Sequence, residues 1–252
     1  MGKIIVFSNQ KGGVGKTTTA VNLGAYMAEA GKKVLLVDFD PQGNLSTFAG
    51  LDKEAPGIYE AVAGIKDVRD VIQKTQVENL YGIGSNINLS GAAIELATVD
   101  NKEKYLRITL EEIKGEWDYI FIDSPPSLGL LSLNGLVAAD YIIIPMQCEY
   151  FALEGLSLLI QTISSVQHSF NPDLRIGGIV FTMYDSRIKL ANEVVRNVTS
   201  YFGDKVFRTV IPRNVALSEA PSHSVPINLY RENCQGASGY KRLAEEVINR
   251  VK

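Results

Sequence analysis

QKGGVGKTTT, residues 10–19, joins an apolar run to a run with helical spacing. Before it, residues 3–8 (KIIVFS) are rich in β-branched side chains and predict a buried strand. After it, residues 17–30 carry apolar side chains at roughly helical intervals and predict a helix. A glycine-rich loop between a strand and a helix surrounds phosphate groups with backbone N–H groups at the helix N-terminus. The stretch therefore predicts a phosphate-binding loop.

Lys16 and Thr17 close this loop. Lys16 is placed to bond the β- and γ-phosphates of a nucleotide, and the Thr17 hydroxyl is placed to ligate Mg²⁺. The match to G-x-x-x-x-G-K-[ST] is imperfect, because Gln10 stands where the first glycine belongs. A glycine turn with incidental lysines is the alternative, and the flanking strand and helix weigh against it. The residues expected to contact the nucleotide are Lys11, Gly12, Gly13, Val14, Gly15, Lys16, Thr17 and Thr18.

Length and composition bound the fold. The chain has 252 residues, of which 46% are hydrophobic, and this is enough for one α/β domain with a full core. Stretches long enough for helices separate most of the further strand-like runs, which occur at 33–38, 118–122, 141–145, 176–182 and 206–211. This alternation predicts a single-domain, doubly wound α/β fold of the P-loop NTPase type over residues 1–252. Its sheet is expected to be mostly parallel and covered on both faces.

Carboxylates follow two of the predicted strands. Asp38 and Asp40 follow the run VLLV, and Asp123 follows the run YIFI. Open α/β sheets bind ligands at the carboxyl ends of their strands, and a buried acid there needs a partner such as Mg²⁺ with its waters. We expect Asp123 to be the outer-shell Mg²⁺ carboxylate and Asp40 to position the attacking water. Asp38 and Asp40 would point the same way on an extended chain. The alternative for these acids is to cap the next helix.

The sequence gives little support for a membrane-spanning, redox-active or metal-cluster protein. The longest uncharged run, residues 124–139, is 16 residues long and contains two prolines, whereas a bilayer span needs about 20 apolar residues. The chain begins with a strand and has no basic and apolar leader, so we expect a cytoplasmic protein. Cys148 and Cys234 lack the spacing of a metal site and are expected to be buried or partly buried thiols.

Five segments together resemble the ParA/Soj branch of the ParA and MinD superfamily of deviant P-loop ATPases, which segregate bacterial chromosomes and plasmids. They span nearly the whole chain and are KGGVGKTT (11–18), VDFDPQGN (37–44), IDSPPSLG (122–129), PMQCEYFALEGL (145–156) and VIPRNVALSEAPSH (210–223). The resemblance implies ATP and Mg²⁺ as cofactors. It implies a catalytic set made of Lys11, Lys16, Asp40 and Asp123.

The resemblance also gives Lys11 a role. In this family the corresponding lysine reaches across a nucleotide-sandwich homodimer to the partner's ATP, as an arginine finger supplied in trans would do. Gly12 must then stay small, because the two loops approach closely. Pro212 and Asn214 match positions that contact adenine, and Met183 is expected to pack on the base. A simple proline-containing connection after a strand is the alternative for residues 210–214.

The charge distribution is more informative about DNA than the net charge of −3. Residues 175–213 hold seven basic and three acidic side chains, a local charge of +4, which suits salt-sensitive contact with backbone phosphates. By resemblance, ATP dimers bind DNA without sequence preference, and the expected contacts are Arg187, Lys189 and Arg213. Ala216 stands where family members commonly have a second arginine, so the dimer would lack two cations. An ordinary solvated face is the alternative.

These features predict an ATPase, hydrolysing ATP to ADP and phosphate, that acts as a switch. ATP would close a dimer, the dimer would bind nonspecific double-stranded DNA, and a ParB/Spo0J-like centromere-binding partner would stimulate turnover on the nucleoid. The main alternative is a membrane-associated division-site ATPase of the MinD type, which needs a C-terminal amphipathic helix on lipid. Residues 240–252 instead predict a last helix packed on the sheet, so we expect no membrane partner. An iron protein of the nitrogenase type would need paired cluster cysteines, and a phosphotransferase would need an Arg-rich lid; neither is evident.

Overall fold

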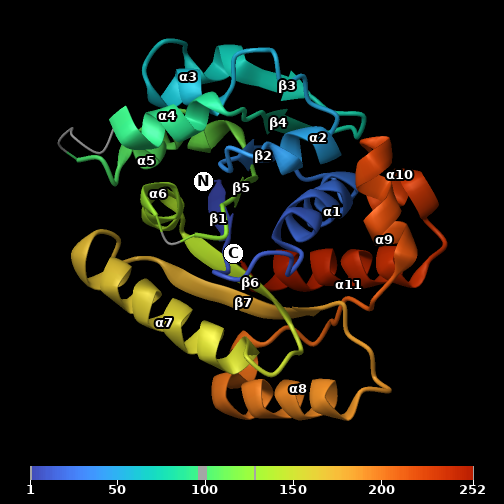
Figure 1. Cartoon of the computed structure of the whole chain (residues 1–252). Coiled ribbons are helices and arrows are strands. Elements are labelled where there is room, and N and C mark those ends of the chain that lie inside the picture. Colours follow the sequence, from blue (N-terminus) through green and yellow to red (C-terminus); the bar gives the residue numbers. More distant parts are fainter. Residues whose placement is uncertain (1, 96–100, 128, 252) are drawn as a thin grey trace.

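The computed structural model describes residues 2–95, 101–127 and 129–251. Within these residues, seven strands form one sheet in the order β3-β4-β2-β5-β1-β6-β7 (Figure 1). The strands are β1 (Lys3–Phe7), β2 (Val34–Asp38), β3 (Ile72–Lys74), β4 (Leu80–Ile83), β5 (Tyr119–Asp123), β6 (Tyr141–Gln147) and β7 (Arg175–Thr182). All neighbouring pairs are parallel except β3 with β4. The predicted doubly wound, mostly parallel α/β fold is confirmed.

Helices cover both faces of the sheet, as Figure 1 shows. The α-helices are α1 (Lys16–Glu29), α2 (Asn44–Phe48), α3 (Ile58–Val62), α4 (Asn88–Glu95), α5 (Tyr105–Glu111), α6 (Leu130–Ala138), α7 (Ala152–Ser169), α8 (Lys189–Phe202), α9 (Val215–Glu219), α10 (Ile227–Arg231) and α11 (Gln235–Arg250). Short 3₁₀ helices are η1 (Val68–Val71), η3 (Lys114–Glu116), η4 (Gly203–Lys205) and η5 (Ala220–His223). No helix in the described ranges has the length and apolar character needed to cross a bilayer.

Two cores lie on either side of the sheet because alternate strand residues face opposite ways. In β1, Ile4 and Val6 join one core, which includes side chains of α3 to α8, whereas Ile5 and Phe7 join the other. The second core holds α1, α2 and the C-terminal helices α9 to α11. The predicted C-terminal helix is α11, and it packs its apolar face on this second core.

The expected strand at 206–211 is wrong. This segment runs beside β7, and the N–H groups of Phe207 and Ile211 donate to the carbonyl oxygens of Ile179 and Phe181 at 2.9 and 2.8 Å. Its pairing with β7 is an isolated bridge, Ile179 with Val206, and not a continuous ladder. Between these bonds, the backbone N–H groups of residues 208 and 209 donate to the Glu246 carboxylate of α11, at 2.8 and 3.1 Å. The Glu246 side chain thus accepts hydrogen bonds from backbone N–H groups that a regular strand would offer to its neighbour. β7 is therefore the last strand at this edge of the sheet.

Strand register brings the functional loops to one edge of the sheet. Phe7 and Asp38 each lie opposite Asp123 in the ladder, and Gln147 lies opposite Thr182. The carboxyl ends of β1, β2, β5, β6 and β7 therefore meet at the same edge, which is where open α/β sheets bind their ligands.

Candidate active site

The predicted phosphate-binding loop connects β1 to α1 and depends on two glycines. Gly13 and Gly15 have φ angles of 72° and 87°, in the left-handed region that other residues seldom adopt, and Gly15 is the N-cap of α1. Gly12 is different, since a Cβ added there would have no heavy atom within 4 Å. Within the described residues, the single chain therefore contains no steric reason for glycine at position 12.

Lys16 and Thr17 lie at the base of this loop, beside Asp123. The Thr17 hydroxyl donates to Oδ2 of Asp123 at 2.6 Å, whereas Oδ1 of Asp123 is buried and has no hydrogen-bond partner among the described residues. Lys16 is 7% exposed, and its Nζ lies 3.4 Å from the carbonyl oxygen of Lys11. The structure thus brings together three of the residues that were assigned to a nucleotide and its metal.

Burial shapes the charges of this group. Burial, with a smaller contribution from Asp38, raises the pKa of Asp123 to about 8, although Thr17 and Lys16 act against the shift. Burial also lowers the pKa of Lys16, opposed by the negative charges of Asp123 and Asp40. A buried acid with a free oxygen beside a hydroxyl suits a hard cation and its waters, so these residues fit a Mg²⁺ site.

Asp38 and Asp40 have different environments despite being two residues apart. Asp38 is fully buried, and its Oδ2 accepts hydrogen bonds of 2.7 Å from both the backbone N–H and the hydroxyl of Ser46 in α2. Asp38 therefore caps the following helix, which is the alternative that the sequence left open. Asp40 is partly exposed, accepts from the Gln42 N–H at 3.0 Å and lines the cavity in front of the loop. Asp40, rather than Asp38, therefore faces this cavity.

Two adjoining cavities meet at the loop. The larger, about 480 Å³, is lined by the phosphate loop, by residues of the 40–48 segment, including Asp40, Asn44 and Phe48, and by Pro126. The smaller, about 190 Å³, is lined by Met183, Pro212 and Asn214, the three residues expected to surround adenine. Both cavities are bordered by Gly15, Thr18, Met183 and Pro221, so they lie next to each other.

Several residues that line or support these cavities were not found from the sequence. Tyr240 of α11 and Leu217 and Ser218 of α9 line the smaller cavity, and Gln147 and Thr182 bond to the loop from the ends of β6 and β7. These side chains lie far along the chain from the loop, and no local pattern marks them. Asn214 has a second role, because its Oδ1 accepts from the Ala216 N–H and caps α9.

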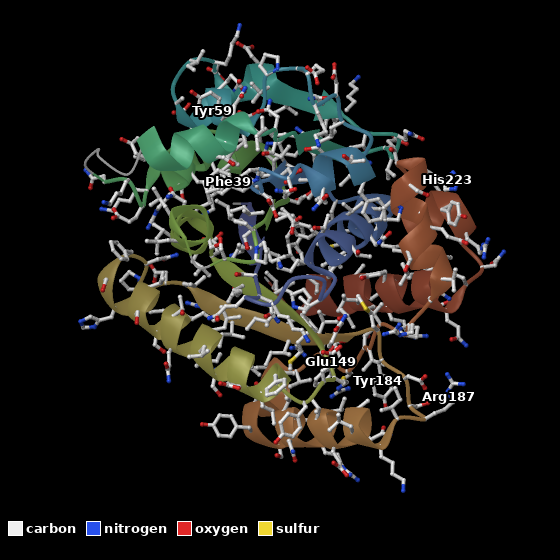
Figure 2. All side chains as sticks on the ribbon, viewed as in Figure 1. Phe39, Tyr59, Glu149, Tyr184, Arg187 and His223 are labelled. Carbon is white, nitrogen blue, oxygen red and sulfur yellow. The ribbon has the colours of Figure 1, made fainter. Side chains whose placement is uncertain are left out.

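Lys11 turns away from Lys16. Its Nζ pairs with the carboxylate of Glu149, which lies just beyond β6 and is labelled in Figure 2. Both side chains are about half exposed, so this ion pair is weak and contributes at most about 1 kcal/mol. Lys11 is thus an exposed cation beside the phosphate loop that only a weak ion pair holds among the described residues.

The residues expected to bind DNA follow β7 along the chain, and one of them, Arg213, also lines the smaller cavity. Arg187 is exposed at the periphery of the molecule and pairs with Asp185 through Nε and Nη2, at 2.9 and 2.7 Å (Figure 2). These bonds, aided by the charge of Arg213, lower the pKa of Asp185 to about 2. Lys189 begins α8, and both it and Arg213 are exposed. Ala216 is only 2% exposed and belongs to the core, so its side chain contributes to no surface.

Comparisons with known proteins agree with this geometry. A family model described as an AAA domain matches residues 2–176. The chromosome-partitioning ATPase Soj of Treponema pallidum is 58% identical over 99% of this chain and 98% of its own length. The sporulation initiation inhibitor protein Soj of Bacillus subtilis is 53% identical over 98% of both chains.

Solved structures show the same fold. The cobyrinic acid a,c-diamide synthase of Mycobacterium smegmatis, with a bound ATP analog and magnesium, is 35% identical and superposes with a TM-score of 0.89 over 100% of this chain and 96% of its own. The septum site-determining protein MinD of Pyrococcus horikoshii, complexed with Mg-ADP, is 27% identical with a TM-score of 0.79, covering 98% and 96%. From its sequence relatives and its phosphate-loop architecture, the chain belongs to the ParA/Soj family of chromosome-partitioning P-loop ATPases.

Proposed function

We propose that this ATPase is a switch in which Mg²⁺-ATP closes a homodimer, the dimer binds nonspecific double-stranded DNA, and hydrolysis returns it to monomers. The observation that carries the proposal is the pair of adjacent cavities at the phosphate loop, of which the larger is lined by Lys16, Thr17 and Asp40, with Asp123 bonded to Thr17 behind them. Relatives of the same fold hold an ATP analog or ADP with magnesium.

At this site the residues divide the work. Lys16 and the N–H groups of the loop bind the phosphates, while Met183, Pro212 and Asn214 hold the base. Thr17 and Asp123 hold Mg²⁺, directly and through water respectively, and the metal when bound neutralises charge that develops on the phosphates. Asp40, which lines the larger cavity, orients the attacking water.

Dimerisation is supported by the surface around the loop. Tyr150 and Phe151 are 74% and 69% exposed, and their rings pack edge to face at 5.1 Å directly after Glu149. Exposed aromatic side chains of this size are typical of protein interfaces. Lys11 lies beside them, held only by a weak ion pair, and is free to reach the nucleotide of a second subunit. The open space at Gly12 is then where the partner's loop packs.

DNA binding is assigned to Arg187, Lys189 and Arg213, which are all exposed and follow the edge strand β7 along the chain. Because these side chains would bind phosphates, affinity should fall steeply with salt. The MinD-like alternative, binding to a membrane, is disfavoured because α11 buries Tyr240, Leu243 and Val247 in the core instead of presenting them to lipid. A ParB/Spo0J-like protein is the proposed partner that stimulates hydrolysis, and the nucleoid is the proposed location.

The test is titration of a random DNA duplex with the ATP-bound Asp40→Ala protein across a salt series. Arg187→Ala should weaken binding and reduce the slope of log K against log salt by about 1 for each phosphate that the arginine no longer neutralises. The control is Arg69→Ala, an arginine that is also paired with acids but lies just before β3 at the opposite edge of the sheet. An ATP-bound dimer that ignores DNA at low salt, or equal slopes for all three proteins, would overturn the DNA assignment.

A further inference from the structure

The last residues of β6 and β7 hold two successive peptide groups of the phosphate loop. Gln147 and Thr182 lie opposite each other in the β6–β7 ladder. Nε2 of Gln147 donates to the carbonyl oxygen of Gly13 at 3.0 Å, and Oγ1 of Thr182 donates to the carbonyl oxygen of Val14 at 2.7 Å. Thr182 is 2% exposed, so water does not compete for its hydrogen bond.

These bonds determine where the loop points its donors. In a trans peptide group the C=O and the N–H point in opposite directions. Holding the carbonyl oxygens of Gly13 and Val14 at the strand ends therefore turns the N–H groups of Val14 and Gly15 away from the strands, toward the cavity that Gly13 and Gly15 line. These are the donors that a phosphate group needs.

The constraint matters because the loop is glycine-rich. Gly13 and Gly15 flank both peptide groups, and glycine adopts positive and negative φ with similar ease. Without a fixed carbonyl, each peptide group could rotate and point its oxygen, rather than its N–H, at a phosphate. Side-chain donors from the ends of the strands prevent this rotation before any ligand binds. The loop is therefore preorganised for binding.

We propose that Gln147 and Thr182 are positioning residues that orient the loop's N–H groups toward the phosphates of the nucleotide. Gln147 has a second contact, since its Nε2 also lies 2.8 Å from Sδ of Met183. The same side chain thus links the phosphate loop to the pocket assigned to the base. This inference rests on the proposed nucleotide site and adds two residues to it that act through the phosphate loop.

The test compares Thr182→Val, which keeps the shape but loses the hydroxyl, with Thr182→Ser, which keeps the hydroxyl. The measured quantities are the Kd for Mg-ADP by calorimetry and the melting temperature of the ligand-free protein. Thr182→Val should raise the Kd about fivefold, the loss expected for one hydrogen bond, while Thr182→Ser stays within about twofold of wild type. Gln147→Met, which removes the amide donor, should also raise the Kd and serves as the test if Thr182→Val does not fold.

The matched control is Thr75→Val. Thr75 also donates its hydroxyl to a backbone carbonyl, that of Leu80 at 2.8 Å, but it lies just after β3 at the other edge of the sheet. Its Kd should equal that of wild type, whatever happens to its melting temperature. Unchanged Kd values in Thr182→Val and Gln147→Met, or a Thr182→Ser protein as weak as Thr182→Val, would overturn the positioning role. Failure of the nucleotide site itself would look different, because wild type would not bind Mg-ADP or Lys16→Ala would bind it equally well.

Discussion

Asp123 is the residue whose environment differs most from that of an ordinary carboxylate. It ends β5, is 1% exposed, and has one oxygen without a partner among the described residues. The cost of ionising it there is set mainly by burial, and Asp38 adds to it. Such a residue destabilises the ligand-free protein, and its presence is explained by what the site binds.

The buried position of Asp123 makes stability depend on pH. Its pKa is raised from 3.8 in the unfolded chain to about 8 in the folded protein, so between these values the folded state binds more protons than the unfolded state. The contribution of Asp123 to stability is therefore present below about pH 4 and is lost as the pH rises through about 8. The Asp123→Asn variant should therefore be more stable than wild type, and the difference in the free energy of unfolding should grow with pH to the order of a few kcal/mol at pH 8.

The measurement is urea denaturation of both ligand-free proteins at several pH values from about 4 to about 8.5, which bracket the two pKa values. Taking the difference between wild type and Asp123→Asn cancels the contributions of carboxylates that do not interact with Asp123. A constant difference across the pH range would contradict the raised pKa.

At the scale of elements, the end of β2 is joined to α2 and to the residues that follow β4 by one serine. The Ser46 hydroxyl donates to Asp38 at 2.7 Å and accepts from the backbone N–H of Ser85 at 2.8 Å, and all three residues are buried. This joint fixes where the chain leaves β2, and therefore where Asp40 and the 40–48 wall of the larger cavity lie.

Ser46→Ala should destabilise the protein by about 2 kcal/mol, because it leaves a buried carboxylate with fewer donors and a buried N–H without its acceptor. Chemical denaturation measures the change in the free energy of unfolding. Ser200→Ala is the control, since Ser200 is exposed near the end of α8 and its loss should cost no more than about 0.5 kcal/mol. Equal losses of stability in the two variants would show that Ser46 does not join the three segments.

The elements that sequence patterns predicted well are those with continuous apolar runs. VLLV in β2 and YIFI in β5 are buried on both faces of the sheet, so their composition alone identifies them. β3 and β4 were missed because they are short, and IQK and LYGI carry little apolar pattern. Residues 206–211 have the composition of a strand, yet the Glu246 carboxylate, far along the chain, takes two of their donors.

The same division applies to the candidate site. Its phosphate loop and its acids after β2 and β5 are local features, and the structure places them together as predicted. The role of Asp38 could not be chosen from spacing, because it depends on where Ser46 folds back. The contacts of Gln147 and Thr182 could not be predicted for a related reason, because each side chain bonds to a backbone group that is distant along the chain.

At the scale of the whole molecule, the single chain supplies most of a hydrolytic site but leaves one cation outside it. Lys11 lies at the rim beside Glu149 and the exposed Tyr150 and Phe151, while Gly12 faces open space. These features are unexplained in a monomer and are explained if a second copy packs on this face. We therefore expect ATP binding and dimerisation to depend on each other.

The test of this mutual dependence is the molecular mass of the Asp40→Ala protein, measured by light scattering with Mg-ATP and with Mg-ADP. Asp40→Ala should retain ATP because the residue proposed to orient the attacking water is gone, so a dimer is predicted with Mg-ATP and a monomer with Mg-ADP. Adding Lys11→Ala to the same protein should return it to a monomer with both nucleotides. A monomer with saturating Mg-ATP, or a dimer that persists unchanged with Mg-ADP and without Lys11, would contradict the switch.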